Sequence, residues 1–418
     1  MEALREAQNY VENLERKVKD LEAKLKKASV SQNPLELASP LKASSKIVIK
    51  VGTSSLVHRK DGIKIGQVAA LMETVAALRR NNHSVLLVTS GAVGTGAHEL
   101  GILERPTTIS RKQALAAVGQ VRLMRELNSM LSTLGVESAQ VLLTYGNLSE
   151  RSQSLNAQNT IEELFRLGVV PVVNENDTVA TEELRFGDND RLSAMVACLI
   201  DANVLFLLTD VNGLYDSNPN VNPNAKRIEV VPDVTVIRNQ IKTDAGPGSE
   251  FSTGGMESKL QAAQIATRGG VKTVIMSATD VRAIPTFVEN PSSIAIGTVC
   301  LPSNNPTKGR KRWIQSLPTR GKIIIDEGAT EAMKMRRTLF AAGVVDVVGK
   351  FNTLDAVEVL SRDHGELLAL GLCNFSFADL RKIMGKKTEE IKEILGDEAE
   401  SLAVIDRDNL AWTAGAKD

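Results

Sequence analysis

The sequence predicts an α/β protein with a mostly parallel sheet sandwiched by helices, a small C-terminal β-barrel-like domain and an N-terminal coiled-coil helix. Three patterns support this fold class. From Lys46 to about residue 300, apolar β-branched runs alternate with helix-length segments, which is typical of a parallel sheet covered on both faces. Residues 318–418 contain short runs with period-two alternation, which favours a separate β domain. A seven-residue apolar repeat fills residues 1–28, as in coiled coils.

Composition restricts the classes of function that fit this chain. At 418 residues with 43% hydrophobic content, it can bury large cores in roughly two or three domains. Its 50 basic and 50 acidic residues balance, so no overall field draws it to nucleic acid or to a membrane. Three scattered cysteines and four histidines argue against a disulfide framework or a zinc site. Without a targeting segment or an apolar run of about 20 residues, a cytoplasmic protein is expected.

The first 28 residues predict a coiled-coil helix. The two apolar seams of the heptads consist of Leu4, Val11, Val18, Leu25 and of Ala7, Leu14, Leu21, Ala28. Valine in one seam and leucine in the other favours a parallel two-stranded homo-oligomer. The alternative is a single amphipathic helix lying on the globular part. Residues 29–45 are rich in serine and contain two prolines, which predicts a flexible linker.

From residue 46 onward, predicted strands alternate with predicted helices. The expected strands are KIVIKV (46–51), SVLLVTSG (84–91), ESAQVLLT (137–144), GVVPVVNEND (168–177), ANVLFLLTD (202–210) and GVKTVIMSA (270–278). The expected helices cover 68–78, 111–134, 151–167 and 189–200. Ligands of such sheets bind beyond the carboxyl ends of the strands, and this is where a site is expected.

Small, polar and charged residues follow each of these strands. They are Lys50, Gly52, Ser90, Gly91, Asn174, Asp177, Thr209 and Asp210, together with Asn189 and Asp190 just before a helix. Each alone is compatible with an ordinary loop or helix cap. Because the strands are parallel, however, these residues converge on one edge of the sheet and predict a binding site there.

The stretch FSTGGMESKL (251–260) suggests which ligand this edge binds. Two glycines before a helix can bring backbone N–H groups to an anion, although a loop and a helix start would look the same. Lys50 and Lys259 both lie beside glycines, and no histidine accompanies them. Phosphoryl transfer requires alignment and positive charge rather than covalent help from the protein. Lysines without a base suit an acceptor that is already an anion, such as a carboxylate.

Seven segments resemble, in the same order, those of the amino acid kinase family, and within it the glutamate 5-kinases. They are IVIKVGTSSL, LLVTSGAVGTG, KQALAAVGQVRLM, VVPVVNENDTVAT, FGDNDRLSA, LLTDVNGLY and FSTGGMESKLQAA. The resemblance covers about residues 46–300 and implies the amino acid kinase fold over 46–305. It further implies transfer of a phosphate from ATP, with Mg²⁺, to the side-chain carboxylate of L-glutamate, the first step toward proline.

The resemblance also implies roles for individual residues. Lys50 and Lys259 resemble the lysines that stabilise the transition state, and Asp190 the carboxylate that positions them. The implied glutamate contacts are Ser90, Gly91, Asn174, Asp177 and Asn189. The implied ATP contacts are Lys50, Gly52, Thr209, Asp210, Thr253, Gly254, Gly255, Met256 and Lys259. No residue is expected to ligate a metal directly.

Further expectations concern substrate and partners. Asp177 can meet the ammonium group of a free amino acid, which an acetylated substrate lacks, since an unpaired buried carboxylate is costly. The alternatives are a family member that acts on aspartate, acetylglutamate or carbamate, or a regulatory RNA-binding protein on a kinase scaffold. Feedback inhibition by proline and a separate glutamyl phosphate reductase are expected from the resemblance.

The C-terminal region, 318–418, resembles a PUA-type domain. Its predicted strands include VVDVVGKF, AVEVLS and LLALGLCNFS, and it ends in SLAVIDRDNLAW. PUA-type domains bind RNA in other proteins, but this one lacks a dense basic and aromatic surface, which favours a structural or regulatory role. The preceding basic run, KGRKRW (308–313), is expected to be a solvated hinge.

Overall fold

The structure is a computed structural model that describes residues 41–412, except 42–43, 59, 105, 181–188, 218–221, 223, 238–254, 292–295, 304–308, 318, 364 and 396–401. The predicted coiled coil, most of the linker, and Thr253 and Gly254 therefore lie outside the described residues. The chain divides into two units, residues 1–41 with 286–295 and residues 42–285 with 296–418. In the first unit, the Leu41 N–H donates to the Val288 carbonyl over 3.1 Å.

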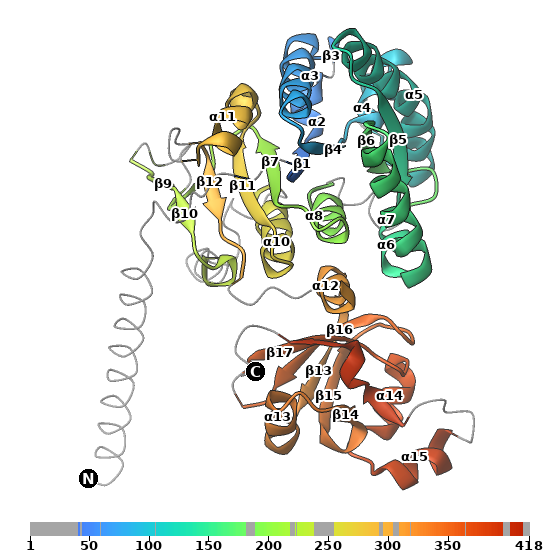
Figure 1. Cartoon of the computed structure of the whole chain (residues 1–418). Coiled ribbons are helices and arrows are strands. Elements are labelled where there is room, and N and C mark those ends of the chain that lie inside the picture. The colour runs from blue at the N-terminus through green and yellow to red at the C-terminus, as the bar shows by residue number, and fades with distance from the viewer. Residues whose placement is uncertain are drawn as a thin grey trace. The chain divides into compact units, whose positions relative to one another are not determined.

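The second unit contains an eight-stranded sheet in the order β10-β12-β11-β7-β1-β4-β6-β5 (Figure 1). The central strands are β1 (Lys46–Val51), β4 (Ser84–Val88), β6 (Val170–Glu175), β7 (Val204–Thr209) and β11 (Lys272–Ser277). The outer strands are β5 (Ser138–Leu143), β10 (Val230–Val231) and β12 (Thr298–Cys300). Every pairing is parallel except that of β11 with β12. The predicted mostly parallel sheet is confirmed.

Helices cover both faces of this sheet. On one face, Val48 and Leu86 share a buried core with α8 (Asp190–Leu199), α10 (Gly255–Arg268) and Ile161 of α7 (Arg151–Arg166). Neighbouring strand residues such as Ile47 point to the opposite face, where α3 (Ile65–Arg80) contacts α5 (Ile109–Thr133). The remaining elements of this region are α2 (Thr53–Leu56), β2 (Val57–His58), β3 (Gly62–Ile63), α4 (Ala92–Glu99), α6 (Tyr145–Ser149), β8 (Leu214–Tyr215), β9 (Arg227–Ile228), η4 (Ala278–Ala283) and α11 (Ile284–Glu289).

The strands form where they were expected because their residues are apolar and buried on both sides. β7, for example, reads VLFLLT and is buried along its whole length, which suits a central parallel strand. The predicted helices at 111–134, 151–167 and 189–200 correspond to α5, α7 and α8, with shifts of one or two residues at their ends. No helix in the described part of the chain is long and apolar enough to cross a membrane.

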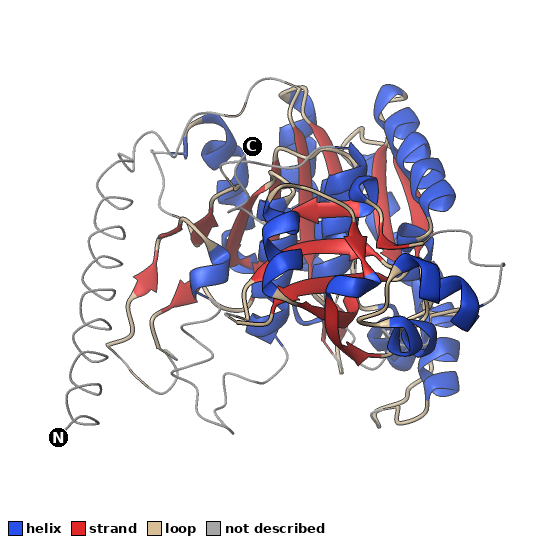
Figure 2. Ribbon diagram, turned by 90° about the horizontal axis from the view of Figure 1, so that it is seen from below, coloured by secondary structure: helices blue, strands red, loops and turns tan. Residues whose placement is uncertain are grey.

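The C-terminal region forms a second, mixed sheet with the order β15-β13-β16-β17-β19. The strands of the molecule are drawn in red in Figure 2. Its strands are β13 (Thr319–Ile325), β15 (Val344–Gly349), β16 (Ala356–Ser361), β17 (Leu367–Leu372) and β19 (Leu410–Trp412). A separate pair joins β14 (Leu339–Phe340) to β18 (Ala403–Ile405). The other elements are α13 (Glu327–Lys334), η6 (Ala341–Gly343), α14 (Phe377–Ile383), α15 (Thr388–Leu395) and η7 (Arg407–Asn409).

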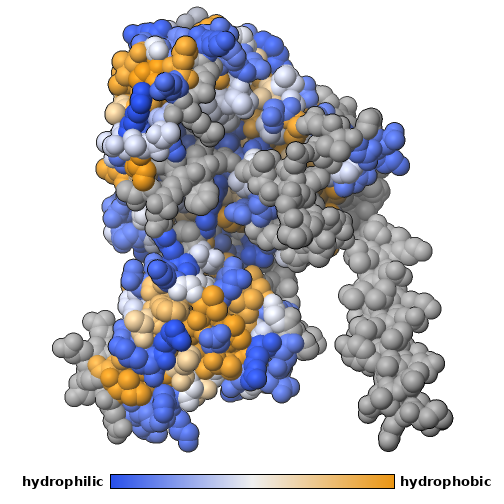
Figure 3. Space-filling view, turned by 180° about the vertical axis from the view of Figure 1, so that it is seen from behind, coloured by the Kyte–Doolittle hydropathy of each residue, from blue (hydrophilic) through white to orange (hydrophobic). Residues whose placement is uncertain are grey.

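One surface of this second sheet region is apolar. An apolar area is visible on the C-terminal domain in Figure 3. Its exposed large apolar side chains include Phe340, Val345, Val348 and Leu354. Val345 and Val348 belong to β15, the edge strand of the sheet.

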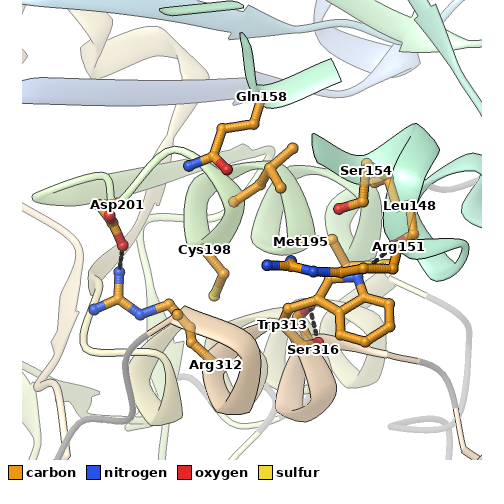
Figure 4. Close-up of a pocket in the computed structure, with 12 residues that line it drawn as sticks. Leu148, Arg151, Ser154, Gln158, Met195, Cys198, Asp201, Arg312, Trp313 and Ser316 are labelled. Atoms are coloured by element: carbon orange, nitrogen blue, oxygen red, sulfur yellow. Dashed lines mark hydrogen bonds and ion pairs between the residues drawn. The ribbon is translucent and has the colours of Figure 1, made fainter. Parts of the chain in front are cut away.

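The solvated hinge expected at 308–313 is wrong for the described residues 309–313. They belong to the helix α12 (Gly309–Ser316), in which Trp313 is only 8% exposed. The Trp313 indole N–H donates to the Leu148 carbonyl over 2.7 Å, and Arg151 lies over the indole ring (Figure 4). Trp313 is buried because its indole N–H finds an acceptor in Leu148, far away in the sequence. The basic run is therefore part of a packed helix.

Candidate active site

Asp190 holds two lysines at the carboxyl end of the large sheet. It is the first residue of α8 and is fully buried. Its Oδ1 lies 2.5 Å from Lys50 Nζ at the end of β1, and its Oδ2 lies 3.0 Å from Lys259 Nζ in α10. Ser258 Oγ donates to the same Oδ2 over 2.9 Å. Two buried ammonium groups thus share one carboxylate, and the cluster keeps a net positive charge.

The local sequence explains how these three side chains reach one point. Lys50 is the next-to-last residue of β1, a strand that lies between β4 and β7, so its side chain stands in the middle of the sheet edge. Asp190 lies at the N-terminus of a helix, where a negative charge is favourable. The Lys259 amine also donates to the Gly255 carbonyl one turn back, over 3.2 Å, and this bond fixes its direction.

The candidate ATP-binding residues within the described chain lie around this cluster. A Cβ on Gly52 would stand 3.7 Å from Lys50 Nζ, so glycine leaves room beside the amine. Thr209 ends β7, the parallel neighbour of β1, and its hydroxyl donates to Asp210 Oδ1 over 3.0 Å. Gly255 begins α10, and Met256 packs against the core below it. The structure thus places Lys50, Gly52, Thr209, Asp210, Gly255, Met256 and Lys259 at the same edge of the sheet.

All five candidate substrate residues line one cavity of about 430 Å³. They are Ser90, Gly91, Asn174, Asp177 and Asn189. The cavity is completed by Thr53, Val57, Ala92, Val93, Gly94, Pro106, Lys112 and Glu175. Residues predicted from separate strand ends are therefore brought together in three dimensions.

A hydrogen-bond chain fixes the polar floor of this cavity. The Asn189 Nδ2 group donates to the Thr89 carbonyl over 2.6 Å and to Asn174 Oδ1 over 2.8 Å. Asn174 Nδ2 in turn donates to Gln120 Oε1 on α5 over 2.7 Å. Because Asn189 immediately precedes Asp190, this chain connects the cavity floor to the carboxylate that holds both lysines.

Two groups in the cavity wall are suited to bind a ligand. Ser90 is 6% exposed, and its Oγ has no hydrogen-bond partner within the described part of the chain. The next residue, Gly91, has φ +105° and precedes the first turn of α4, a backbone conformation that favours glycine. Burial raises the pKa of the Asp177 carboxyl to about 6, because the charged form loses hydration.

Two polar residues of the site, Lys112 and Gln120, were not predicted from the strand ends. Lys112 lines the cavity and Gln120 supports Asn174, and both belong to the helix α5. Neither residue follows a strand, because both lie inside a helix. Their only sequence signal was the segment KQALAAVGQVRLM, which contains both and belongs to the resemblance.

The parallel sheet, the lysine cluster and the adjacent cavity define a phosphotransferase of one fold family. The chain belongs to the amino acid kinase family, whose sequence pattern matches residues 45–277. The pattern of the PUA domain matches residues 321–395. Both matches confirm the families expected from the sequence.

More closely, the chain is similar to glutamate 5-kinases. The glutamate 5-kinase of Cyanothece sp. is 46% identical over 367 residues, which is 87% of this chain and 98% of that relative. The glutamate 5-kinase of Synechococcus elongatus is 45% identical over 370 residues, covering 88% of this chain and 99% of the relative. Among solved structures, the carbamate kinase from Giardia lamblia bound to AMP-PNP is 14% identical, with a TM-score of 0.45 over 62% of this chain and 99% of that chain.

Proposed function

We propose that this protein transfers the terminal phosphate of ATP to the side-chain carboxylate of L-glutamate, producing L-glutamyl 5-phosphate, the first step toward proline. The observation that carries the proposal is the position of the lysine cluster. Asp190 binds both Lys50 and Lys259, and its neighbour Asn189 lines the cavity that would hold the acceptor. The similarity to two glutamate 5-kinases over nearly their full lengths supports the choice of glutamate.

The chemistry requires little from the protein beyond charge and alignment. A phosphoryl group in transfer carries negative charge on its oxygens, and two ammonium groups held in fixed positions stabilise that charge without reorganising. The acceptor is already a carboxylate, so no general base has to remove a proton. Asp190 holds each amine in place through an ion pair, and it is therefore a positioning residue.

Mg²⁺ is proposed to enter with the nucleotide. Within the described residues, no group of three or more His, Cys, Asp or Glu side chains is placed to hold a metal. Mg²⁺ characteristically binds phosphate oxygens and keeps several waters, which fits a site that offers lysines rather than a carboxylate cage. The ion would neutralise phosphate charge when ATP is bound.

The cavity suits a free amino acid. In its ionised form, Asp177 would pair with the substrate ammonium, while Ser90 Oγ and the backbone after Gly91 would bind the α-carboxylate. N-acetylglutamate would leave the Asp177 charge without a partner, which is unfavourable for a half-buried group. Aspartate and carbamate remain alternative acceptors, to be separated by experiment.

We further propose the context in which the enzyme works. Proline would act as feedback inhibitor, and a separate reductase would consume the unstable acyl phosphate in the cytoplasm. The functional domains would be 46–305 and 318–418, with homo-oligomers formed through residues 1–28. Deleting residues 1–35 should lower the mass measured by light scattering, and an unchanged mass would favour the single-helix alternative.

A hydroxamate assay tests the reaction. The full chain is incubated with Mg-ATP, hydroxylamine and one acceptor at a time: L-glutamate, N-acetyl-L-glutamate, L-aspartate or carbamate. Hydroxylamine traps acyl phosphates, so colour from glutamate alone supports the proposal. Hydroxamate from another acceptor would reassign the substrate. No product from any acceptor, together with salt-sensitive RNA binding, would support the scaffold alternative.

A further inference from the structure

A second cavity, remote in sequence from the lysine cluster, has an unusual lining. It encloses about 290 Å³ and is lined by Lys311, Met335, Arg336, Arg407 and Trp412. These residues come from α12, from the end of α13, from η7 and from β19. Three of the five are cations, and none of the described residues that line it is acidic.

An adjoining surface hollow shares Lys311 and adds Arg310, Asn409 and two carboxylates, Asp406 and Asp408. Asp406 Oδ2 already accepts a hydrogen bond from Asn374 Nδ2 over 2.9 Å. Taken together, the two hollows contain four cations and two anions, a net charge of +2. This excess of positive charge among the lining residues would attract an anion.

Arg336 has a backbone conformation that residues other than glycine seldom adopt. It comes directly after Met335, the C-cap residue of α13, and has φ +57°. Helices that end in this left-handed conformation usually place glycine there. The chain instead has an arginine whose side chain lines the cavity, and such strain is typical of functional positions.

We propose that this cavity binds the phosphate groups of a small anion. Guanidinium groups present several N–H donors in a plane that matches phosphate oxygens, and Lys311 adds a point charge. Met335 and Trp412 provide an apolar wall for the rest of the ligand. The volume, near the lower end of small-molecule sites, favours a compact phosphorylated metabolite over a polymer.

The position of the cavity connects it to the rest of the molecule. Lys311 belongs to α12, whose Gln315 donates to the Trp412 carbonyl over 2.9 Å and whose Trp313 donates to Leu148 in the kinase domain. A bound anion would therefore contact the helix that packs against both domains. The inference does not depend on the proposed kinase reaction, since none of its residues belongs to that site.

Binding of pyrophosphate to the full chain tests the proposal. Titration calorimetry is performed at low ionic strength with a non-hydrolysable ATP analogue at saturation, so that the kinase site is occupied. Two double variants that remove the same charge are compared. Lys311→Met with Arg407→Gln alters the cavity, whereas Lys350→Met with Arg362→Gln alters exposed positions of the same domain.

We expect the wild type and the control variant to bind pyrophosphate alike, and the cavity variant to bind at least about 10-fold more weakly, as for losing charge-assisted hydrogen bonds. Equal affinity of the two variants, or no binding by the wild type, would overturn the proposal. If the double cavity variant unfolds at a lower temperature, the single variant Lys311→Gln is used in its place.

A second arm identifies the source of the phosphate. Fluorescence anisotropy with a short single-stranded RNA is measured for the same three proteins. RNA binding that weakens only in the cavity variant would assign the site to nucleic-acid phosphates. Absence of RNA binding alongside pyrophosphate binding supports a small phosphorylated ligand.

Discussion

At the scale of single residues, Asp190 is the side chain on which the candidate site depends most. Its two oxygens contact different lysines, one from β1 and one from α10. Removing one member of a buried ion pair leaves the remaining charges poorly compensated. A variant that lacks Asp190 leaves two lysines without their shared carboxylate, whereas a variant that lacks one lysine leaves Asp190 paired with the other. Single lysine variants are therefore easier to interpret.

Replacing Lys259 by methionine should reduce turnover with glutamate by about 10²- to 10⁴-fold, the size of losing one preorganised charge-stabilising contact. Binding of glutamate should change little, because the cavity is lined by other residues. The measurements are steady-state kinetics and equilibrium binding of glutamate. Lys259→Arg, which keeps the charge, serves as control and should retain more activity. Near-normal turnover in Lys259→Met would rule out the proposed role.

The raised pKa of Asp177 predicts a pH dependence of substrate capture. Burial raises this pKa from 3.8 to about 6, so the carboxyl is increasingly protonated as the pH falls below about 6. Only the ionised form attracts the substrate ammonium. kcat/KM for glutamate, which reports on the free enzyme, should therefore decline as the pH is lowered through about 6.

The variant Asp177→Asn provides the control for this effect. Its KM should exceed that of the wild type above about pH 6, and its kcat/KM should lack the decline near pH 6. Stability gives an independent check. Between pH 3.8 and about 6 the folded state binds more protons than the unfolded state, so the wild type should lose stability as the pH rises through this window. A wild-type kcat/KM that stays constant from pH 8 to 5 would contradict the assignment.

At the scale of elements, the crossing of α4 and α5 shapes the cavity wall. A Cβ on Gly119 would lie 1.9 Å from the Ala92 carbonyl oxygen, and one on Gly96 would lie 1.9 Å from the Leu115 carbonyl oxygen. Only glycines allow the two helix backbones to approach so closely. Ala92 also lines the cavity, so the position of α4 is tied to that of α5.

Gly119→Ala should therefore destabilise the protein by about 1–3 kcal/mol, the usual cost of overpacking, and weaken glutamate binding by displacing α4. Gly66→Ala is the matched control. Gly66 lies in α3 with nothing within 4 Å of its Cβ, so alanine should stabilise by about 0.4–1 kcal/mol. The measurement is the thermal unfolding midpoint of the two variants and of the wild type. The midpoint should fall in Gly119→Ala and rise in Gly66→Ala, and equal midpoints for both variants would refute the packing argument.

At the scale of the whole molecule, α12 connects the large sheet to the C-terminal domain. Trp313 and Ile314 share a buried cluster with Met195 of α8 and with Leu372 and Ala411 of the second sheet. The Arg312 guanidinium pairs with Asp201 (Figure 4). The two matched family regions are therefore joined by a continuous apolar core.

Trp313→Ala should remove this connection at a cost of about 3–5 kcal/mol, the range for truncating a buried tryptophan. Differential scanning calorimetry should then resolve two transitions instead of one, because each domain keeps its own core and loses cooperation with the other. Lys350→Ala, an exposed position, is the control. An unchanged single transition in Trp313→Ala would show that other contacts couple the domains.

Much of the fold and of the site could be predicted because the relevant information is local. Buried strands such as β7 are apolar along their length, and the parallel arrangement brings their polar ends to one edge. This reasoning anticipated Ser90, Asn174, Asp177 and Asn189, which the structure brings into one cavity. The coiled coil of residues 1–28 stays a prediction.

The rest was decided by contacts between segments far apart in the chain. Spacing in the sequence does not reveal that one carboxylate divides its oxygens between Lys50 and Lys259. Nor does it reveal that Gln120 braces Asn174 from a helix, or that Leu148 accepts the Trp313 indole N–H and makes a packed helix of an expected hinge. The sequence by itself determined which residues favour strands, helices and anion binding, because these are local preferences of backbone and side chain. The tertiary structure alone decided which of them meet, because burial and charge pairing depend on neighbours that only folding supplies.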